Sequence, residues 1–235
     1  MHESLHRYFR HILVFNGSDM TRRLLAGALL AAGLAVALPA TADARLEEIG
    51  KLERGVQGSC PRTCLAIPRT TGYQAKIGPN RAAYTIPRDG RIVAWTVSLG
   101  KPGPNQTKFF NERLGGESQA ALAILQPGEK LTHTVVAKSP MMKLQEWFGM
   151  YVQFPLEESI PVKKGQLLAL SVPTWAPALQ VNLGGDTSWR SSRPKGSCND
   201  TAEQSALVGD TDSAQFYCLY RTARLTYSAT LVSTP

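Results

Sequence analysis

One short apolar run limits what this chain can fold into. Within the stretch 160–175, a turn at residues 163–165 leads into the run 167–172, which Pro173 follows. An apolar run of this length, bounded by turn residues and a proline, is typical of a buried β-strand. We therefore expect residues 167–172 to form a central strand of a β-sheet.

Further strand candidates recur along the chain, with turn signals between them. They are residues 81–86, 91–99, 120–125, 131–138, 151–154 and 179–183, an extended segment at 188–192, and a long C-terminal run at 216–232 that contains no Gly, Pro, Asn or Asp. In residues 91–99, Trp95 and Val97 share one face with Val93 and Leu99, which predicts a strand with one face more buried than the other. Many short strands without alternating helices predict an all-β fold, an antiparallel β-sandwich.

The segments between the strands are predicted to be cover pieces and loops. Leu46, Ile49, Leu52 and Val56 recur at helical spacing, which favours a short N-terminal helix, with a frayed linker as the alternative. Residues 58–72 contain two prolines and predict an irregular cover segment. Loops are expected at 100–116, with one or two helical turns at 106–114, and at 186–213. The predicted organisation is thus an N-terminal segment, 45–72, followed by a sandwich domain, 73–235.

The N-terminal region has the features of an export signal. Met20-Thr-Arg-Arg precedes an apolar run at 24–38, and Ala42-Asp43-Ala44 provides a cleavage site. We expect residues 1–44 to be removed, a mature chain that starts near Arg45, and translation that begins at Met20. The apolar run is shorter than a membrane span of about 20 residues, so we expect a secreted or extracytoplasmic protein, with a retained N-terminal anchor as the alternative.

The chain contains four cysteines, all in the predicted mature part: Cys60, Cys64, Cys198 and Cys218. An even number of cysteines in an exported chain predicts two disulfides, which have three possible connectivities. We favour pairing within each of the two sequence-local pairs, and the crossed pairings remain open. The spacing differs from that of zinc ribbons, so we expect no metal site, and no cofactor motif is present in the sequence.

Few residues are suited to catalysis. Only His133 remains in the predicted mature chain, on a strand face with apolar residues, and we interpret it as a packed core histidine. Carboxylates are available for acid–base chemistry: Glu112, Glu117, Glu157, Glu158, Asp186, Asp200, Glu203, Asp210 and Asp212. Glu157 and Glu158 are adjacent in an extended segment, so we expect them on opposite faces and unsuited to act as a pair.

A ligand site is predicted where aromatic and charged residues follow central strands. Trp175, Asp186, Trp189 and Arg190 meet at one end of the sandwich if the loop 186–213 folds back across the sheet. An aromatic ring beside a carboxylate and a guanidinium suits a sugar ring and its hydroxyl groups. The competing interpretation is that both tryptophans cap the core and that the basic residues form a solvated loop.

Two motifs carry a resemblance to known proteins. Gly90-Arg-Ile-Val-Ala-Trp-Thr-Val and Ile160-Pro-Val-Lys-Lys-Gly-Gln-Leu-Leu-Ala-Leu resemble the jelly-roll sandwiches of carbohydrate-binding modules. The predicted mature chain also resembles secreted actinobacterial proteins of unassigned function. The resemblance implies a jelly-roll-like sandwich and supplies no catalytic residues.

Three function classes follow from these observations. The formal net charge of +8 favours an anionic partner, so the leading hypothesis is non-catalytic binding of a glycan or an anionic cell-surface polymer. The second is a carboxylate-dependent glycan hydrolase or lyase, and the third is a structural or protein-interaction role in the cell envelope. We expect no nucleic-acid partner, and the sequence does not determine the oligomeric state.

Overall fold

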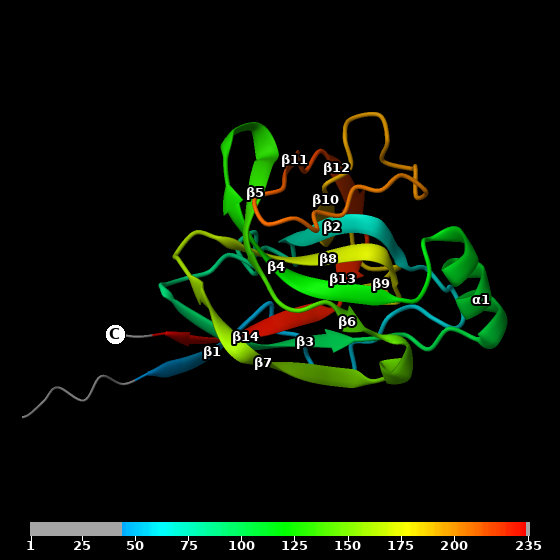
Figure 1. Ribbon diagram of the computed structural model, residues 1–235, viewed down its shortest axis with the longest axis horizontal. Coiled ribbons are helices and arrows are strands. Elements are labelled where there is room, and N and C mark those ends of the chain that lie inside the picture. Colours follow the sequence, from blue (N-terminus) through cyan, green and yellow to red (C-terminus); the bar gives the residue numbers. More distant parts are fainter. Residues whose placement is uncertain (1–43, 234–235) are drawn as a thin grey trace, which may run out of the picture. The chain divides into compact units, whose positions relative to one another are not determined.

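The apolar run at 167–172 lies at the centre of the fold, as predicted. The structure, a computed structural model, describes residues 44–233, and there the run is part of strand β8 (Leu167–Ala176), which lies between β4 and β2 in the larger of two main sheets (Figure 1). The predicted signal segment lies outside the described residues.

The larger sheet has eight strands. Seven of them follow each other in the order β11 (Ser213–Gln215), β5 (Thr132–Lys138), β4 (Gln119–Pro127), β8, β2 (Ile67–Lys76), β10 (Ser188–Ser191) and β12 (Cys218–Arg221), and β6 (Met142–Lys143) also pairs with β4. All of these pairings are antiparallel.

The smaller sheet has four antiparallel strands and brings the two ends of the described chain together. Its order is β1 (Arg45–Ile49), β14 (Tyr227–Ser233), β3 (Gly90–Ser98) and β7 (Tyr151–Val162). A separate two-stranded sheet consists of β9 (Leu179–Gln180) and β13 (Arg224–Leu225). The result is an all-β, sandwich-like fold.

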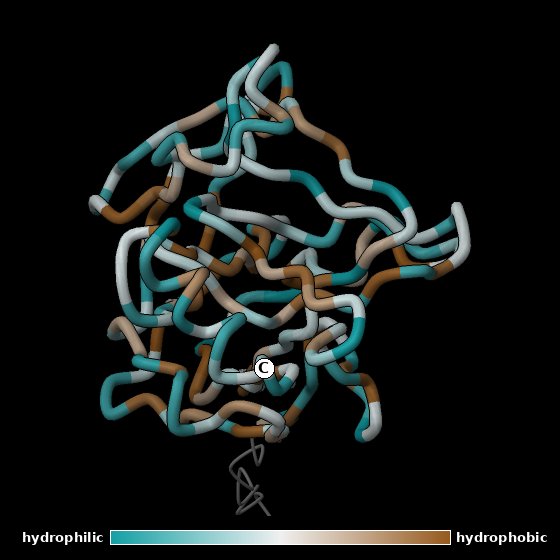
Figure 2. Tube along the Cα trace, turned by 90° about the vertical axis from the view of Figure 1, so that its right-hand side faces the viewer, coloured by the Kyte–Doolittle hydropathy of each residue, from teal (hydrophilic) through white to brown (hydrophobic). Residues whose placement is uncertain are grey.

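The main core lies between the two sheets and takes buried residues from strands of both. Figure 2 shows hydrophobic and hydrophilic segments interspersed along the trace. Trp95 of β3 is fully buried there, as its alternating strand predicts, and its ring lies 4.9 Å from that of Phe154. A second, smaller cluster lies on the other face of the larger sheet and includes Tyr73, Val135 and Phe216. The larger sheet is therefore covered on both faces in this region.

Three short helices lie in the connections: α1 (Pro104–Arg113), η1 (Glu129–Leu131) and η2 (Gln145–Trp147). The helix α1 confirms the turns expected at 106–114. It begins with Pro104 at the first helical position, where the missing N–H needs no partner. The Gln106 side chain accepts a hydrogen bond from the Gly103 N–H at 2.7 Å, which closes the first turn.

The short N-terminal helix expected from residues 46–56 is not shown. Arg45–Ile49 instead form β1, which pairs with β14 from Arg45 opposite Ser233 to Ile49 opposite Ala229. Leu46 is 76% exposed and Ile49 is buried. The helical spacing of these residues was outweighed by pairing with a distant strand, because strand formation depends on neighbours rather than on local preference alone.

The segment 58–72 was predicted to be an irregular cover, but β2 begins within it at Ile67 and lies inside the larger sheet. Thr70 and Thr71 are buried in β2, and their hydroxyl groups bond to those of Ser192 and Ser171 at 3.0 Å each. Residues 45–72 therefore contribute a strand to each sheet, and the expected boundary at residue 72 falls within β2.

The long C-terminal run at 216–232 is three strands rather than one. β12, β13 and β14 belong to three different sheets, and Thr222 lies between the first two with a φ of 58°. A threonine rarely adopts this left-handed conformation, so the sequence gives no signal for the break. The predicted strand at 81–86 is reduced to one isolated bridge at Thr85, and the one at 179–183 to the two residues of β9.

Two prolines expected to end strands lie within them. Pro155 is inside β7, which extends to Val162 because it is an edge strand, where a missing N–H is tolerated. Pro173 lies inside β8, opposite a register shift of β2 at which Arg69 has a φ of 41°. The ladder is already interrupted there, so the proline removes no regular pairing.

Both predicted disulfides are confirmed. Cys60 is bonded to Cys64, and Cys198 is bonded to Cys218, which we call the loop disulfide. Within residues 44–233, no helix combines the length and hydrophobicity needed to cross a bilayer.

Candidate functional site

Trp175, the first residue of the predicted ligand site, is a buried cap between β8 and α1. Its indole N–H donates to Asn111 Oδ1 at 2.9 Å and to the Gly116 carbonyl at 3.0 Å. The rings of Phe110 and Phe148 pack against it at 4.8 and 5.4 Å. A ring with these contacts has no free face for a sugar.

Trp189 is also buried, but in β10 and inside the main core. Its ring stacks on Tyr220 of β12 with centroids 4.4 Å apart and an interplanar angle of 21°. Gly72 of β2 lies against the same ring, and a Cβ at that position would be 2.9 Å from two of its carbons. Trp189 therefore packs three neighbouring strands together rather than facing a ligand.

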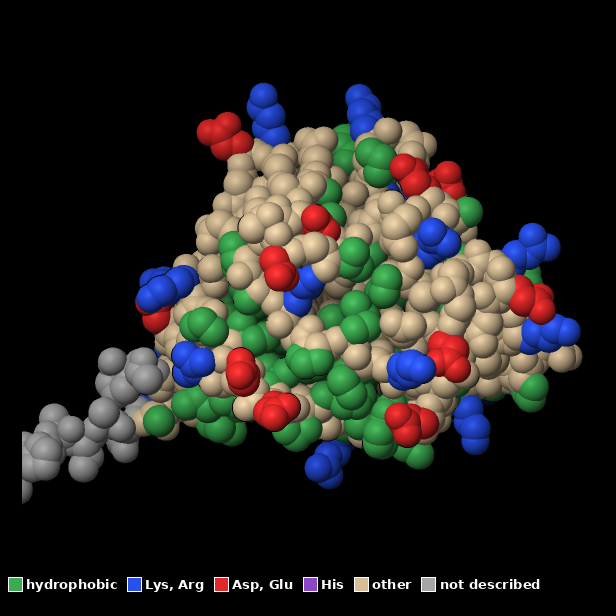
Figure 3. All heavy atoms as spheres, in the orientation of Figure 1, with side chains coloured by type: hydrophobic (Ala, Val, Ile, Leu, Met, Phe, Trp, Pro, Cys, Tyr) green, Lys and Arg blue, Asp and Glu red, His purple; other side chains and the backbone are tan. Residues whose placement is uncertain are grey.

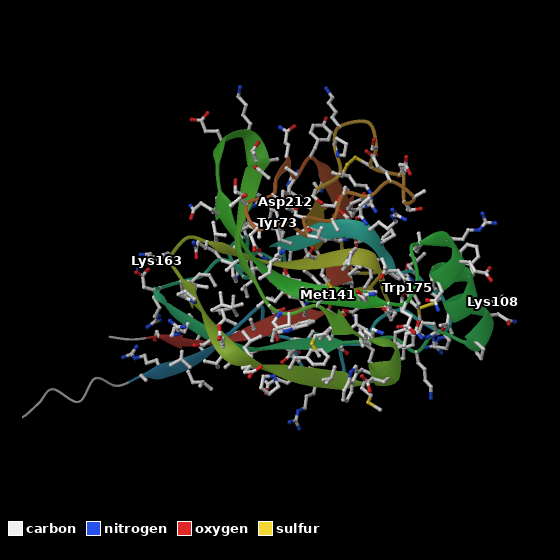
Figure 4. All side chains as sticks on the ribbon, in the orientation of Figure 1. Tyr73, Lys108, Met141, Lys163, Trp175 and Asp212 are labelled. Carbon is white, nitrogen blue, oxygen red and sulfur yellow. A yellow bond between two sulfur atoms is a disulfide. The ribbon has the colours of Figure 1, made fainter. Side chains whose placement is uncertain are left out.

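The structure does not bring the four predicted site residues together. Trp175 lies opposite Pro68 of β2, whereas Trp189 lies opposite Gln74, six residues further along that strand, or about 20 Å at 3.3 Å per residue. Figure 4 shows Trp175 beside α1, whereas Tyr73, the β2 residue opposite Arg190, lies under the loops of the C-terminal region. Asp186 is exposed in a turn before β10.

Arg190 is the predicted site residue that remains accessible to a ligand at the sheet surface. It lies in a cross-strand row on the outer face of the larger sheet, between Tyr73 of β2 and Leu219 of β12. One guanidinium nitrogen, Nη1, donates to the carbonyls of Phe216 and Tyr217 at 3.1 and 3.0 Å. These two bonds fix the guanidinium beside the end of the segment 192–217, which connects β10 to β12 and which we call the covering loop.

The surface next to Arg190 combines cations with exposed apolar side chains. Tyr217 is 41% exposed and Leu219 is 37% exposed, and Lys195 Nζ lies over the Tyr217 ring, 5.8 Å from its centroid. Arg221, two residues beyond Leu219 on edge strand β12, is also exposed. We call Arg190, Lys195, Tyr217, Leu219 and Arg221 the basic corner.

The three cations of the basic corner make no ion pair within the described part of the chain. The salt bridges found there join other residues, among them Lys138 with Asp210 at 3.4 Å and Lys143 with Glu117 at 3.3 Å. The positive charge of this surface is thus not neutralised by neighbouring carboxylates, and an anionic ligand would meet it directly.

A buried aromatic cluster supports Arg190 from beneath. His133 is buried, as predicted, and its ring lies 5.3 Å from that of Tyr73 and 5.1 Å from that of Phe216. Burial lowers the pKa of His133, and the charge of Arg190 lowers it further, against a backbone hydrogen bond at Thr132 that raises it. Burial raises the pKa of the Tyr73 hydroxyl, which also favours its neutral form. Both side chains therefore tend to stay neutral beside the fixed guanidinium.

The covering loop is fastened to the sheet by polar contacts. The Leu207 N–H donates to Thr71 Oγ1, and Ser171 Oγ donates to the Leu207 carbonyl, each at 2.8 Å. Arg193, which is 1% exposed, donates to the carbonyls of Pro68 and Asp200 and to the Tyr220 hydroxyl. With the loop disulfide, these contacts hold the basic corner in one arrangement before any ligand binds.

Three of the predicted carboxylate candidates line a groove elsewhere on the surface. Glu157, Glu158 and Asp210 line a groove of about 600 Å³ between β7 and the end of β5. Glu157 and Glu158 were expected on opposite faces, but the pairing of β7 with β3 is irregular between Pro155 and Ile160, and both side chains are exposed and line this groove. Within residues 44–233, no group of three His, Cys, Asp or Glu side chains could hold a metal ion.

An apolar surface lies between the edges of the two sheets. Figure 3 shows hydrophobic side chains gathered over the region of β6 and β7, with charged side chains around them. Met141, just before β6, and Met150 and Tyr151, at the start of β7, are exposed at 38%, 52% and 43%.

Comparison with known proteins provides no family for this fold and site. No family model matches the chain, and no curated protein and no solved structure matches it. Sequence reasoning named Arg190 but assigned Tyr217 and Leu219 only to the long strand candidate at 216–232. No local signal marked them, because their place at the sheet edge follows from the pairing of β12 with β10.

Proposed function

We propose that this protein is an exported, non-catalytic binder of an acidic glycan or similar anionic cell-surface polymer, and that the basic corner is its binding surface. The observation that carries the proposal is a group of three cations without ion pairs in the described part of the chain, of which Lys195 lies over the exposed Tyr217 ring and Arg190 donates to the Tyr217 carbonyl. The formal net charge of +8 supports an anionic partner, and the two disulfides are consistent with an oxidising compartment.

The chemistry of the corner suits an acidic sugar. The guanidinium groups of Arg190 and Arg221 can each present two parallel N–H donors to a carboxylate or sulfate, a geometry that lysine lacks. The Tyr217 ring offers an apolar face to the C–H side of a sugar ring. Because Lys195 and Arg221 are exposed, each contributes about 0.2–1 kcal/mol, and the attraction weakens as salt rises.

We further propose that the fold is a jelly roll. Strands β1 to β4 alternate between the two main sheets, and β6, β7 and β8 do so again, whereas β4 to β6 and β10 to β12 all belong to the larger. This alternation supports two interlocked Greek keys, the arrangement of a jelly roll. Export itself is tested by intact-mass analysis of secreted material, which should begin at or near Arg45. Protein recovered from membranes with Met20 still attached would exclude cleavage.

Binding is tested with immobilised acidic and neutral polysaccharides, alongside an assay for released reducing sugar. We expect binding to the acidic polymers, weaker binding at high salt and no release. Reversing two charges with Lys195→Glu and Arg221→Glu should weaken binding about tenfold or more. Lys101→Glu combined with Lys164→Glu reverses two exposed charges outside the basic corner and is the matched control. Binding that survives the double reversal would refute the corner as the site.

A glycan hydrolase or lyase is the second candidate function, favoured by the groove that Glu157, Glu158 and Asp210 line. Two carboxylates flanking one groove are what glycoside hydrolysis requires. Release of reducing sugar that is lost in Glu157→Gln and Glu158→Gln would establish it. No binding and no release would leave the structural or protein-interaction role.

A further inference from the structure

One end of the molecule carries the helix α1 and the loop that the shorter disulfide closes. Figure 1 shows α1 at the periphery of the fold, beyond the ends of the neighbouring strands. The Gln106 side chain of α1 donates to the Pro61 carbonyl of the loop at 2.9 Å, so the two segments are in contact. We call residues 58–66 and 100–114 the helix tip.

The helix tip exposes two large apolar side chains. On α1, Phe110 packs against Trp175 at 4.8 Å between ring centroids, whereas the neighbouring Phe109 is 55% exposed. Leu65, in the disulfide-closed loop, is 49% exposed. Packing inside the molecule accounts for Phe110 but not for Phe109 or Leu65. Apolar side chains left exposed within a polar surface are a mark of interaction sites.

The same surface is positively charged. Its charged side chains are Arg62, Lys101, Lys108, Arg113 and Glu112, all exposed, which gives the helix tip a formal charge of +3. The carboxylate of Glu112 lies 3.9 Å from Lys108 Nζ, a loose pair on the surface of the helix. Figure 4 shows Lys108 on the side of α1 that faces away from the sheets.

A shallow groove lies between two of these cations. It has a volume of about 660 Å³, and Lys101, Lys108, Pro102 and Pro104 are among its lining residues. A phosphate group placed in this groove would meet two ammonium groups, with apolar wall beside them. The groove thus adds a place for a headgroup to the exposed apolar and cationic side chains of the helix tip.

A lipid surface with anionic headgroups fits all of these features. A dissolved acidic polymer would satisfy the cations but leave Phe109 and Leu65 in water, and an apolar partner would bury the cations without counter-charges. An anionic bilayer attracts cations at its surface and takes up apolar side chains at the boundary between headgroups and acyl chains. We propose that the helix tip docks on an anionic phospholipid surface, with Phe109 and Leu65 entering this boundary and the cations contacting phosphate groups.

The helix tip and the basic corner are different surfaces. Trp175 lies beneath α1, Trp189 lies next to Arg190 in β10, and the two tryptophans are about 20 Å apart along β2. Lipid docking therefore does not depend on the binding function proposed above, and each surface can be changed without the other.

The test is co-sedimentation with vesicles of phosphatidylcholine alone and of phosphatidylcholine mixed with phosphatidylglycerol. The protein is used from Arg45 onward, which keeps every strand of the described fold, because the apolar run at 24–38 would itself bind lipid. We expect binding to the anionic vesicles only, weakening as salt rises. Phe109→Ser should weaken it about fivefold or more, and Lys108→Gln combined with Arg113→Gln about tenfold or more.

A dye at position 109 reports whether the ring enters the lipid. All four native cysteines form disulfides, so the cysteine of Phe109→Cys can be labelled alone with a polarity-sensitive dye. Its emission should shift to the blue with anionic vesicles. Val208→Ser and Val208→Cys are the matched controls, because Val208 is an apolar residue of the covering loop that is 49% exposed. They should bind as wild type and show no shift.

Three results would overturn the proposal: no binding to anionic vesicles, undiminished binding in either helix-tip variant, or unchanged emission of the dye at position 109. Lys195→Gln with Arg221→Gln should leave vesicle binding unchanged, and a loss equal to that of the helix-tip variants would assign the lipid contact to the basic corner instead. The helix-tip variants should still bind acidic polysaccharide, so a failure of either proposal is seen separately. Thermal unfolding shows whether each variant is folded.

Discussion

Replacing Arg193 by methionine should lower the free energy of unfolding by about 4 kcal/mol. The guanidinium donates to the carbonyls of Pro68 and Asp200 and to the Tyr220 hydroxyl. Methionine fills much of the same space but donates nothing, so two carbonyls lose a partner at about 1–3 kcal/mol each. The Tyr220 hydroxyl keeps its own bond to the Cys198 carbonyl and adds little. Removing a buried charge also relieves its desolvation, which limits the total loss.

The loss is measured by urea unfolding without reductant, followed by tryptophan fluorescence, with an unchanged dependence on denaturant as the sign of a purely energetic effect. A fall of about 4 kcal/mol corresponds to a melting temperature roughly 8–16 °C lower for a domain of this size. Arg81→Met, at an exposed position, is the control and should change stability by less than about 0.5 kcal/mol. If Arg193→Met lost less than about 1 kcal/mol, the two carbonyls would not depend on the guanidinium, and the reasoning would be refuted.

Three further predictions concern the larger sheet. Burial lowers the pKa of His133 in the folded state, so the stabilisation linked to its neutral ring is complete above the unfolded-state pKa and is lost as the pH falls through the lower folded-state pKa. Urea unfolding from about pH 7.5 to 4.5 should show a smaller loss of stability in His133→Gln than in the wild type. Equal losses in the two proteins would contradict this prediction. Gly72→Ala places a Cβ 2.9 Å from the Trp189 ring and should cost about 1–3 kcal/mol, whereas Gly185→Ala, with nothing within 4 Å, should cost much less; equal melting temperatures would contradict this. Replacing both cysteines of the loop disulfide by alanine should cost about 3 kcal/mol, because the bond spans 20 residues; a smaller effect than for the bond that spans 4 would contradict the loop-entropy argument.

The features predicted correctly are those set by short-range signals. Trp95 alternates with its neighbours along one strand, and the run 167–172 is short and bounded, so both predicted strands were confirmed. The disulfide pairing followed from the short separations within each cysteine pair. The helix α1 followed from a stretch that starts with Pro104 and has no alternation.

The features that were missed depend on partners far away in the sequence. β2 contains Pro68 and Gly72, which weaken any strand signal, and its buried threonines are tolerated only because Ser171 and Ser192 bond to them. The four-residue ligand site failed for the same kind of reason. No local pattern fixes which residues of β2 lie opposite Trp175 and Trp189, so their separation could not be predicted.

The pairing of β1 with β14 makes completion of the fold depend on the end of the chain. Arg45 lies opposite Ser233, so during synthesis from the N-terminus β1 stays without its partner until β14 has been made. Contacts over such a separation form late, because a long loop must close before they are made. The smaller sheet should therefore be completed only once β14 is available to pair with β1. A variant that stops before Tyr227 should show no cooperative unfolding, whereas one that lacks only the final two residues should unfold as the full chain does.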